Sequence, residues 1–322
     1  MTAGGTVRVG LIGAGRMGRN HLDALERASG VTIAGVVEPA PERRAAVAAD
    51  GHPVYERPGD LLGGDGVDAV VIAAPSDLHR PLVQAIAERG LPVLCEKPVG
   101  VHLADAVAAS AAAAEHGTLL QVGYWRRFVP ELRRLRERIA AGELGDICQL
   151  SCLQWDAEPP AAAFRARSGG IAVDMAVHEF DQARWLTGQE LTWVAAAPAG
   201  EPAGRDPDAA TVLAQLSGGA ALTVSVGRRF PHGDCCWLEV FGTDGYERLE
   251  FIWGTAGDAA FEAALTAQVE AFAARVRGEA GPEAAFAAGG GDAVAALAAA
   301  ELAGEALVDG RRHDVPAPSG HG

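Results

Sequence analysis

The sequence predicts an α/β protein built from two domains, and three observations support this prediction. Apolar runs alternate with helical segments over residues 1–123, a pattern typical of a parallel sheet covered by helices. A glycine-rich turn joins the first apolar run to the first helix. Over residues 124–322, strand-like segments recur through short turns, which favours an α+β domain with an open, mainly antiparallel sheet. We therefore expect domains at residues 1–123 and 124–322.

Composition limits the partners that the protein can bind. Lys and Arg number 27 against 42 Asp and Glu, and the resulting net charge of −15 argues against nucleic acid or an anionic membrane surface. The Ala-rich stretches are too interrupted to span a bilayer. Residues 1–5 are polar and lack the apolar region of a secretory signal. The five cysteines have no metal-ligand spacing, so we expect reduced thiols, no metal site and a cytoplasmic protein.

The glycine-rich turn has the spacing G-x-G-x-x-G and lies between the strand at 7–12 and a helix. In that context the spacing is the fingerprint of dinucleotide binding. Gly13 permits the tight turn, Gly15 lets the backbone approach a pyrophosphate, and Gly18 lets helix and strand pack closely. The helix N-terminus then faces the phosphates. The cofactor-binding residues expected in this turn are Gly13, Ala14, Gly15, Arg16, Met17 and Gly18.

An acidic residue, Glu38, ends the second predicted strand, about 20 residues beyond the glycines. A carboxylate there can accept hydrogen bonds from the adenosine ribose hydroxyls and repels a 2′-phosphate, so the sequence favours NAD over NADP. Arg43 and Arg44 on the next helix weaken this choice, although a solvated helix face explains them better. Further cofactor contacts are expected after later strand ends, at Ala74, Pro75, Ser76, His79, Glu96 and Lys97, with a helix cap or surface position as the alternative for His79.

The strand at 93–95 ends in Glu96, Lys97 and Pro98. A lysine at the carboxyl end of a parallel strand stands where ligands bind in α/β proteins. The alternative is a solvated ion pair worth about 0–1 kcal/mol. Since a dinucleotide fingerprint precedes this segment, we expect Lys97 to lie between the nicotinamide and a substrate.

Asp174 and His178 are four residues apart in a segment whose apolar residues have helical spacing. Both side chains should therefore project from one helix face. A carboxylate can orient an imidazole and raise its basicity, which suits proton transfer near neutral pH. A surface Asp–His pair of small energetic worth is the alternative. We expect Lys97, Asp174 and His178 to be the catalytic residues.

Five segments together, at 13–18, 74–79, 95–98, 121–128 and 174–181, resemble the glucose–fructose oxidoreductase / inositol dehydrogenase family (Gfo/Idh/MocA), nearest to its inositol 2-dehydrogenase branch. The resemblance implies a Rossmann domain followed by a substrate-binding domain whose open sheet forms homodimers or homotetramers. It also implies that Lys97, Asp174 and His178 are the catalytic triad, and that Pro98 follows a cis peptide bond. Substrates of the family are polyols, sugars, inositols and their keto forms.

The expected reaction is hydride transfer between NAD and a secondary alcohol of a cyclic polyol or sugar. One alternative is a keto-sugar or imine reductase in a biosynthetic pathway, and another is a non-catalytic nucleotide-sensing regulator. The loop at 229–234 lacks the tyrosine that inositol dehydrogenases usually carry, so His232 or Asp234 would replace it. The expected substrate-binding residues are Lys97, Trp125, Arg126, Trp155, Asp156, Arg165, Asp174, His178 and His232, with Arg167 as a further candidate. For Trp125 and Trp155, a partly buried core position is the alternative, and it explains large aromatic side chains better.

Overall fold

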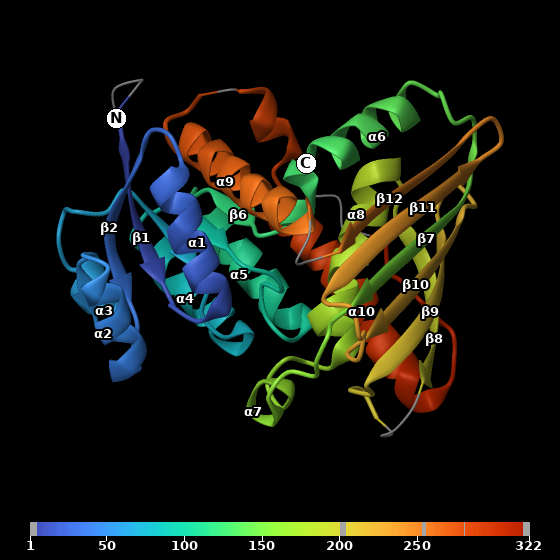
Figure 1. The fold of residues 1–322 in the computed structure, drawn as a ribbon, viewed down its shortest axis with the longest axis horizontal. Coiled ribbons are helices and arrows are strands. Elements are labelled where there is room, and N and C mark those ends of the chain that lie inside the picture. Colours follow the sequence, from blue (N-terminus) through green and yellow to red (C-terminus); the bar gives the residue numbers. More distant parts are fainter. Residues whose placement is uncertain (1–4, 200–203, 253–255, 280, 318–322) are drawn as a thin grey trace. The chain divides into compact units, whose positions relative to one another are not determined.

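The computed structural model describes residues 5–199, 204–252, 256–279 and 281–317, so residues 1–4 of the polar start lie outside the described residues. The chain divides into two compact units (Figure 1). The first comprises residues 1–100, 104–128 and 261–290, and the second comprises residues 101–103, 129–260 and 291–322.

Six parallel strands form the sheet of the first unit, in the order β3-β2-β1-β4-β5-β6. The strand order reverses beside β1, because β2 pairs with one edge of β1 and β4 with the other. Ligands of such sheets bind at this reversal, beyond the carboxyl ends of the strands. The strands are β1 Val7–Ile12, β2 Val31–Val37, β3 Val54–Tyr55, β4 Ala69–Ile72, β5 Val93–Cys95 and β6 Leu120–Val122.

Apolar side chains explain why this sheet forms. Every residue of β4, β5 and β6 is buried, as expected for parallel strands covered on both faces. Helix α1 buries one stripe, at residues spaced three and four apart, against the sheet. The helices and short turns of this unit are α1 Arg16–Arg27, α2 Pro41–Ala49, α3 Pro58–Leu62, η1 Ser76–Leu78, α4 His79–Ala87, α5 Leu103–Glu115, η2 Trp125–Phe128, α9 Ala256–Val276 and η4 Pro282–Phe286.

The second unit contains a seven-stranded sheet in the order β12-β11-β7-β10-β9-β8-β13. All neighbours pair antiparallel except β7 and β10, which run parallel, so the predicted open, mainly antiparallel sheet is confirmed. The strands are β7 Ile147–Trp155, β8 Leu191–Ala199, β9 Ala209–Leu216, β10 Ala221–Gly227, β11 Cys235–Gly242, β12 Tyr246–Ile252 and β13 His313–Asp314.

Helices cover one face of this second sheet, as Figure 1 shows for α8 and α10. Burial alternates along β9 and β10, which is typical of a sheet with one packed and one open face. On the packed face, Cys152 of β7 receives a hydrogen bond from Gln182 of α8. The remaining elements are α6 Pro130–Ala140, α7 Ala162–Arg165, the π-helical turn η3 Ala172–Ala176, α8 Val177–Thr187 and α10 Gly290–Asp309.

The two compact units differ from the domains expected at 1–123 and 124–322, because residues 124–128 and 261–290 belong to the first unit. The ring of Trp125 packs edge-on against Phe261, with ring centroids 4.9 Å apart. Gln121 of β6 donates a hydrogen bond to the backbone carbonyl of Gln268 on α9, and Arg275 donates one back to Gln121. A helical pattern in the sequence does not reveal which sheet the helix contacts, so this assignment needed the fold.

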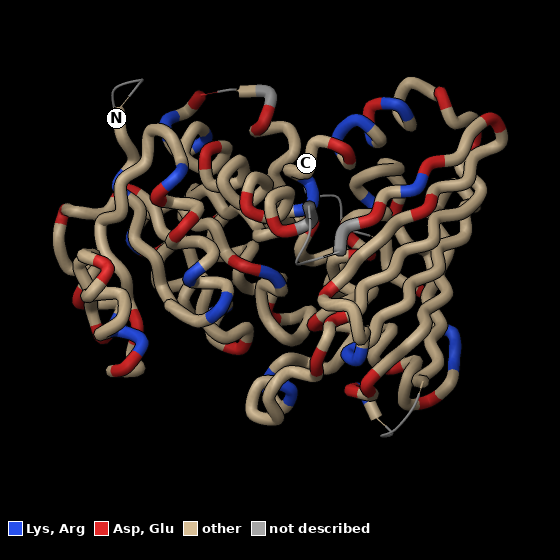
Figure 2. The backbone as a smooth tube through the Cα atoms, in the orientation of Figure 1, with Lys and Arg blue, Asp and Glu red and all other residues tan. Residues whose placement is uncertain are grey.

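Charged residues of both signs are scattered over both units, as Figure 2 shows. Acidic residues outnumber basic ones, and the net charge is −15. Within the described part of the chain, each helix is too short or too polar to cross a membrane.

Candidate functional site

The glycine-rich turn after β1 has the three features that pyrophosphate binding needs. Gly13 has a φ of +99°, and a Cβ there would lie 2.6 Å from the carbonyl oxygen of Ala73. A Cβ on Gly18 would lie 2.1 Å from the carbonyl oxygen of Gly13, so only glycine lets α1 approach the turn. By contrast, a Cβ on Gly15 would meet nothing within 4 Å. The backbone at Gly15, the N-cap of α1, is therefore open to a ligand.

Glu38, directly after β2, is buried beside this turn. Its Oε2 accepts the Ala14 N–H at 2.9 Å, and its Oε1 accepts the Ala40 N–H at 2.8 Å and the Arg43 guanidinium at 2.9 Å. Burial raises the pKa of the Glu38 carboxyl, but hydrogen bonds from Arg43 and the two amides outweigh burial and hold the pKa below its ordinary value. Glu38 is therefore a carboxylate at neutral pH, which suits ribose hydroxyls rather than a phosphate. Arg43, whose side chain is exposed, forms an ion pair with Glu38, so it is more than a solvated residue on the surface of α2.

The segment after β5 contains a buried pair that sequence reasoning missed. His21 of α1 is fully buried, and its Nε2 lies 2.6 Å from Oε1 of Glu96. The other carboxylate oxygen accepts the backbone N–H of Lys97 at 3.2 Å. Gly123 leaves room for this carboxylate, because a Cβ there would lie 2.9 Å from it. Helical spacing could have placed His21 on the buried stripe of α1, but nothing local indicates its partner 75 residues away.

The Lys97–Pro98 peptide bond is cis, as the family resemblance implied. His79, at the start of α4, is buried, and its Nδ1 lies 2.6 Å from the Pro98 carbonyl oxygen. Its Nε2 lies 2.8 Å from the carbonyl oxygen of Ala74. The imidazole therefore bridges the loop after β4, which contains Pro75 and Ser76, to the loop after β5. Both ring nitrogens thus face backbone carbonyl oxygens, which gives His79 a structural role, and its expected cofactor contact stays a prediction.

Asp174 and His178 lie where a π-helical turn passes into an α-helix. The Val177 N–H donates to the carbonyl oxygen of Ala172, five residues earlier, which closes the π turn η3 around Asp174. His178 follows in the first turn of α8 and is 7% exposed. π turns are rare and often occur at functional sites. The two residues thus share one continuous helical path, as predicted, with a wider turn at Asp174 than an α-helix provides.

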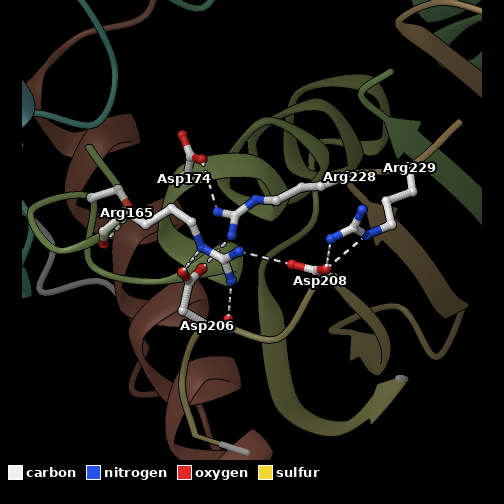
Figure 3. A network of polar contacts seen from close by, with 7 residues as sticks. Arg165, Asp174, Asp206, Asp208, Arg228 and Arg229 are labelled. Carbon is white, nitrogen blue, oxygen red and sulfur yellow. Dashed lines mark hydrogen bonds and ion pairs between the residues drawn. The ribbon is translucent and has the colours of Figure 1, made fainter. Parts of the chain in front are cut away.

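A buried arginine, also missed from the sequence, contacts Asp174. Arg228 follows β10 and is fully buried. Its Nη2 lies 3.2 Å from Oδ2 of Asp174, and its Nη1 lies 2.6 Å from Oδ1 of Asp206 (Figure 3). The only local signal was a charged residue that follows an alternating strand. The ion pair spans 54 residues, so no periodicity could reveal it.

Three expected substrate-binding residues have other contacts. Trp125 and Arg126 are buried in the first unit, at 7% and 5% exposure, where Trp125 packs against Phe261. Trp155 donates from Nε1 to the hydroxyl of Ser225 at 3.1 Å, and its ring lies over Gly227, where a Cβ would come within 2.4 Å of it. Alternation along β7 directs Trp155 to the open face, opposite Cys152, which contacts α8. Trp155 therefore points away from the face that carries His178.

The remaining candidates lie around the carboxyl ends of β7 and β10. Arg165 of α7 is engaged by carboxylates, with Nε 2.6 Å from Asp206 and Nη1 2.8 Å from Asp208. Asp156 follows β7, and its backbone bonds to Gly227 and Phe230. His232 is exposed in the loop after β10, and its ring meets Phe230 edge-on. Arg167 is exposed. Of this group, the structure ties Arg165 to the network that contains Asp174.

A parallel sheet whose first turn is shaped for a pyrophosphate, with a buried carboxylate after β2, is typical of dinucleotide-binding proteins. The chain belongs to the GFO/IDH/MocA family of oxidoreductases: the family's NAD-binding Rossmann-fold model matches residues 7–124, and its C-terminal domain model matches residues 132–247. The predicted family, the Rossmann fold and the NAD cofactor are thereby confirmed.

Relatives of known name agree with this assignment. The chain is 50% identical over 305 residues to the rhizopine catabolism protein MocA of Rhizobium meliloti, covering 93% of this chain and 95% of the relative. It is 35% identical over 248 residues to the scyllo-inositol 2-dehydrogenase (NAD(+)) of Bacillus subtilis, covering 74% and 72%. A myo-inositol dehydrogenase structure from Corynebacterium glutamicum superimposes with a TM-score of 0.86 at 26% identity, covering 97% of this chain and 99% of that one.

Proposed function

We propose that this protein is an NAD-dependent dehydrogenase that oxidises a secondary alcohol of a cyclic polyol, inositol or a close derivative, to the ketone. The observation that carries the proposal is the combination, in one chain, of an open glycine turn with an acid–imidazole pair, Asp174 and His178, at a π turn. The names of the relatives, two of which are inositol dehydrogenases, support the substrate class.

Each catalytic residue has a distinct proposed role. His178 accepts the proton of the substrate hydroxyl, because imidazole exchanges protons near neutral pH. Asp174 orients the ring and stabilises the imidazolium that forms. Lys97 stabilises the alkoxide that develops on the substrate oxygen, an electrostatic role worth several kcal/mol in a site that excludes water. Bound NAD supplies the acceptor for the hydride that leaves the carbinol carbon. In the reverse direction His178 returns the proton to the oxygen of the ketone.

Substrate hydroxyls need polar partners besides the catalytic residues. We propose Asp156 and His232, which lie at the ends of β7 and in the loop after β10, as those partners. His232 then occupies the loop position where inositol dehydrogenases usually carry a tyrosine. Arg165 contributes indirectly, because its guanidinium is already bound by Asp206 and Asp208.

The test is the absorbance of reduced nicotinamide with the purified protein, NAD and a panel of myo-inositol, scyllo-inositol, other inositols and aldoses. We expect NAD-dependent reduction with at least one inositol. Turnover only with keto-sugars or imines and NADH would identify a reductase instead. Tight NADH binding without turnover of any panel member would contradict the proposal and favour a nucleotide-sensing regulator.

Replacing Glu38 with glutamine is expected to shift the cofactor preference toward NADP. The amide keeps an acceptor oxygen for only one of the Ala14 and Ala40 N–H groups, turns its NH2 donor toward the other, and loses the charge that holds Arg43. A charge-assisted hydrogen bond is lost and Arg43 can meet a 2′-phosphate, so the ratio of NADPH to NADH dissociation constants should fall by about tenfold or more. Fluorescence titration of both reduced cofactors measures this ratio. The control is Glu42→Gln, which changes an exposed acid on α2, the helix that carries Arg43. An equal ratio of NADPH to NADH dissociation constants in both variants would refute the role of Glu38.

We also propose that two copies pair through the open face of the second sheet, as homodimers or as part of homotetramers. Small and apolar side chains lie in register across it at Ala195, Leu213 and Thr223, and Leu213 is 45% exposed. Stable dimers bury about 800 Å² per partner, which a seven-stranded face can supply. The five cysteines are free thiols, which supports the cytoplasm as the location of this assembly.

Leu213→Asp is expected to reduce the molar mass measured by light scattering during gel filtration, because it places a charge in the proposed interface. Val107→Asp is the control, since Val107 is 47% exposed on α5 of the other unit. If Leu213→Asp retains the mass of the wild-type protein, or if the wild type is monomeric, the proposed interface is wrong.

A further inference from the structure

An ionic network of alternating sign surrounds Asp174 in the second unit (Figure 3). Arg228 contacts both Asp174 and Asp206. Arg165 binds Asp206 and also Asp208. Asp208 in turn accepts a hydrogen bond of 2.8 Å from Arg229. The members come from the turn η3, from α7, from the segment before β9 and from the end of β10. The network formally contains equal numbers of arginines and aspartates: Arg165, Arg228 and Arg229 against Asp174, Asp206 and Asp208.

We propose that Arg228 is a positioning residue for Asp174, an inference that rests on the proposed function. Its guanidinium binds one carboxylate oxygen of Asp174, and the other oxygen points away from Arg228 in Figure 3. The second guanidinium nitrogen is held by Asp206, so Arg228 cannot rotate without breaking that bond. Arg228 thereby fixes the direction in which Asp174 presents its carboxylate, and this direction decides how Asp174 can orient His178.

Burial explains why an arginine occupies this position. The Arg228 side chain is fully buried, and a buried charge is tolerated only when it is paired and hydrogen-bonded. A planar guanidinium presents donors in fixed directions, so it can bind two carboxylates at once, whereas an ammonium group is a point charge on a flexible stem. Asp206 is in turn held by Arg165. The outer pairs thus support the inner pair of Arg228 and Asp174.

The alternative is a purely structural cluster that ties the loops of the second unit together. The two roles differ in what they couple. A structural cluster lowers stability whenever a member is removed, and activity falls in proportion. A positioning role makes the loss of activity in Arg228→Met depend on whether Asp174 is present.

A double-mutant cycle tests this coupling, with Arg228→Met, Asp174→Asn and both together. Wild-type turnover of the inositol panel is measured first, and its absence would refute the proposed function. With turnover present, we expect Arg228→Met to lower kcat on the order of 100-fold while the Kd of NADH stays unchanged, because misplacement of a catalytic group costs about that much. In the double variant, kcat should match Asp174→Asn alone to within about twofold. Multiplicative losses would overturn the positioning role.

Two further variants guard against loss of folding. Arg228→Lys keeps the charge and should recover part of the lost kcat. Arg184 lies on α8, as His178 does, has low exposure and donates to the Glu190 carboxylate at 2.7 Å. Arg184→Met should therefore lower the stability of the protein without the loss of kcat. Equal kcat losses in Arg184→Met and Arg228→Met would contradict the inference. The same cycle in thermal unfolding needs no substrate: additive Tm changes for Arg228→Met and Asp174→Asn would show that the pair is not coupled, and would overturn the inference whatever the substrate is.

Discussion

Lys97→Met is expected to lower kcat by about 100- to 1,000-fold, the usual cost of removing one donor that stabilises a developing oxyanion. Methionine has a similar length and shape but no charge, so the change isolates the ammonium group. The backbone around position 97 should persist, because the Lys97 N–H still donates to Glu96 and the side chain is only half-buried. The Kd of NADH, measured by fluorescence, should change far less than kcat.

The composition of the chain allows Lys97 to be modified selectively by chemical reagents. It is the only lysine among the 27 Lys and Arg residues of the chain, so a lysine at this strand end contrasts with a strong arginine bias elsewhere. An amine-reactive acylating reagent can therefore modify one side chain besides the N-terminus, and it should abolish turnover at a rate that NADH slows. Lys97→Arg should remain far below the wild type, because a guanidinium differs from an ammonium in shape and donor geometry.

The matched control for the lysine variants is Arg57→Met, which removes an exposed cation paired with Asp60 in the same unit. It should leave kcat within about twofold, as expected for a distant surface pair. If Lys97→Met keeps kcat within about tenfold of the wild type, Lys97 does not stabilise charge in the transition state. Loss of NADH binding without loss of kcat at saturation would instead restrict Lys97 to holding the cofactor.

The first unit was predictable because its signals are local. Buried parallel strands have continuous apolar runs, and glycine is required where a Cβ would strike backbone, as at Gly13 and Gly18. The second sheet was predictable as a set of strands but not in its order. β7 and β10 are separated by three helical segments and two strands, so their parallel pairing depends on packing that the sequence pattern does not contain.

The catalytic candidates were predictable because residue types cluster at strand ends and at helical spacing. Their supporting residues were not. His21 and Arg228 are charged or polar residues in buried positions, and each is stabilised by a partner far away in the sequence. For Trp155 the strand pattern gives the direction of the side chain, because alternation directs its ring to the open face, where its Nε1 donates to Ser225. Periodicity can predict that a polar residue is buried, but identifying its hydrogen-bond partner requires the three-dimensional structure.

Removing His21 should destabilise the protein more than removing Glu96, although the two residues form one pair. His21→Leu leaves the Glu96 carboxylate buried, at 4% exposure, without its imidazole partner, and breaking a buried pair in this way costs about 3–5 kcal/mol. Glu96→Leu instead leaves the buried His21 imidazole without its hydrogen-bond partner, so the loss should be nearer the about 1–3 kcal/mol of an unsatisfied polar group. Denaturant unfolding followed by circular dichroism measures both free energies.

The double variant His21→Leu/Glu96→Leu sharpens this prediction. Replacing both members of a buried polar pair by apolar groups is often nearly neutral, so the double variant should be more stable than His21→Leu alone. The control is His52→Leu. His52 lies 2.9 Å from the half-exposed carboxylate of Glu26, which is on α1 like His21. Its loss should lower the free energy of unfolding by less than about 1 kcal/mol. If the two single losses simply add in the double variant, the pair contributes no coupling.

Function should respond to the same pair, because Glu96 also accepts the backbone N–H of Lys97. His21→Leu frees that carboxylate to move, and Lys97 moves with it, so kcat should fall even at temperatures where the variant is fully folded. His21→Gln keeps a hydrogen-bond donor of similar reach toward Oε1 of Glu96, and it should restore more of kcat than of stability. Full activity in folded His21→Leu would confine the pair to a structural role, and Lys97 would then be positioned by the strand end alone.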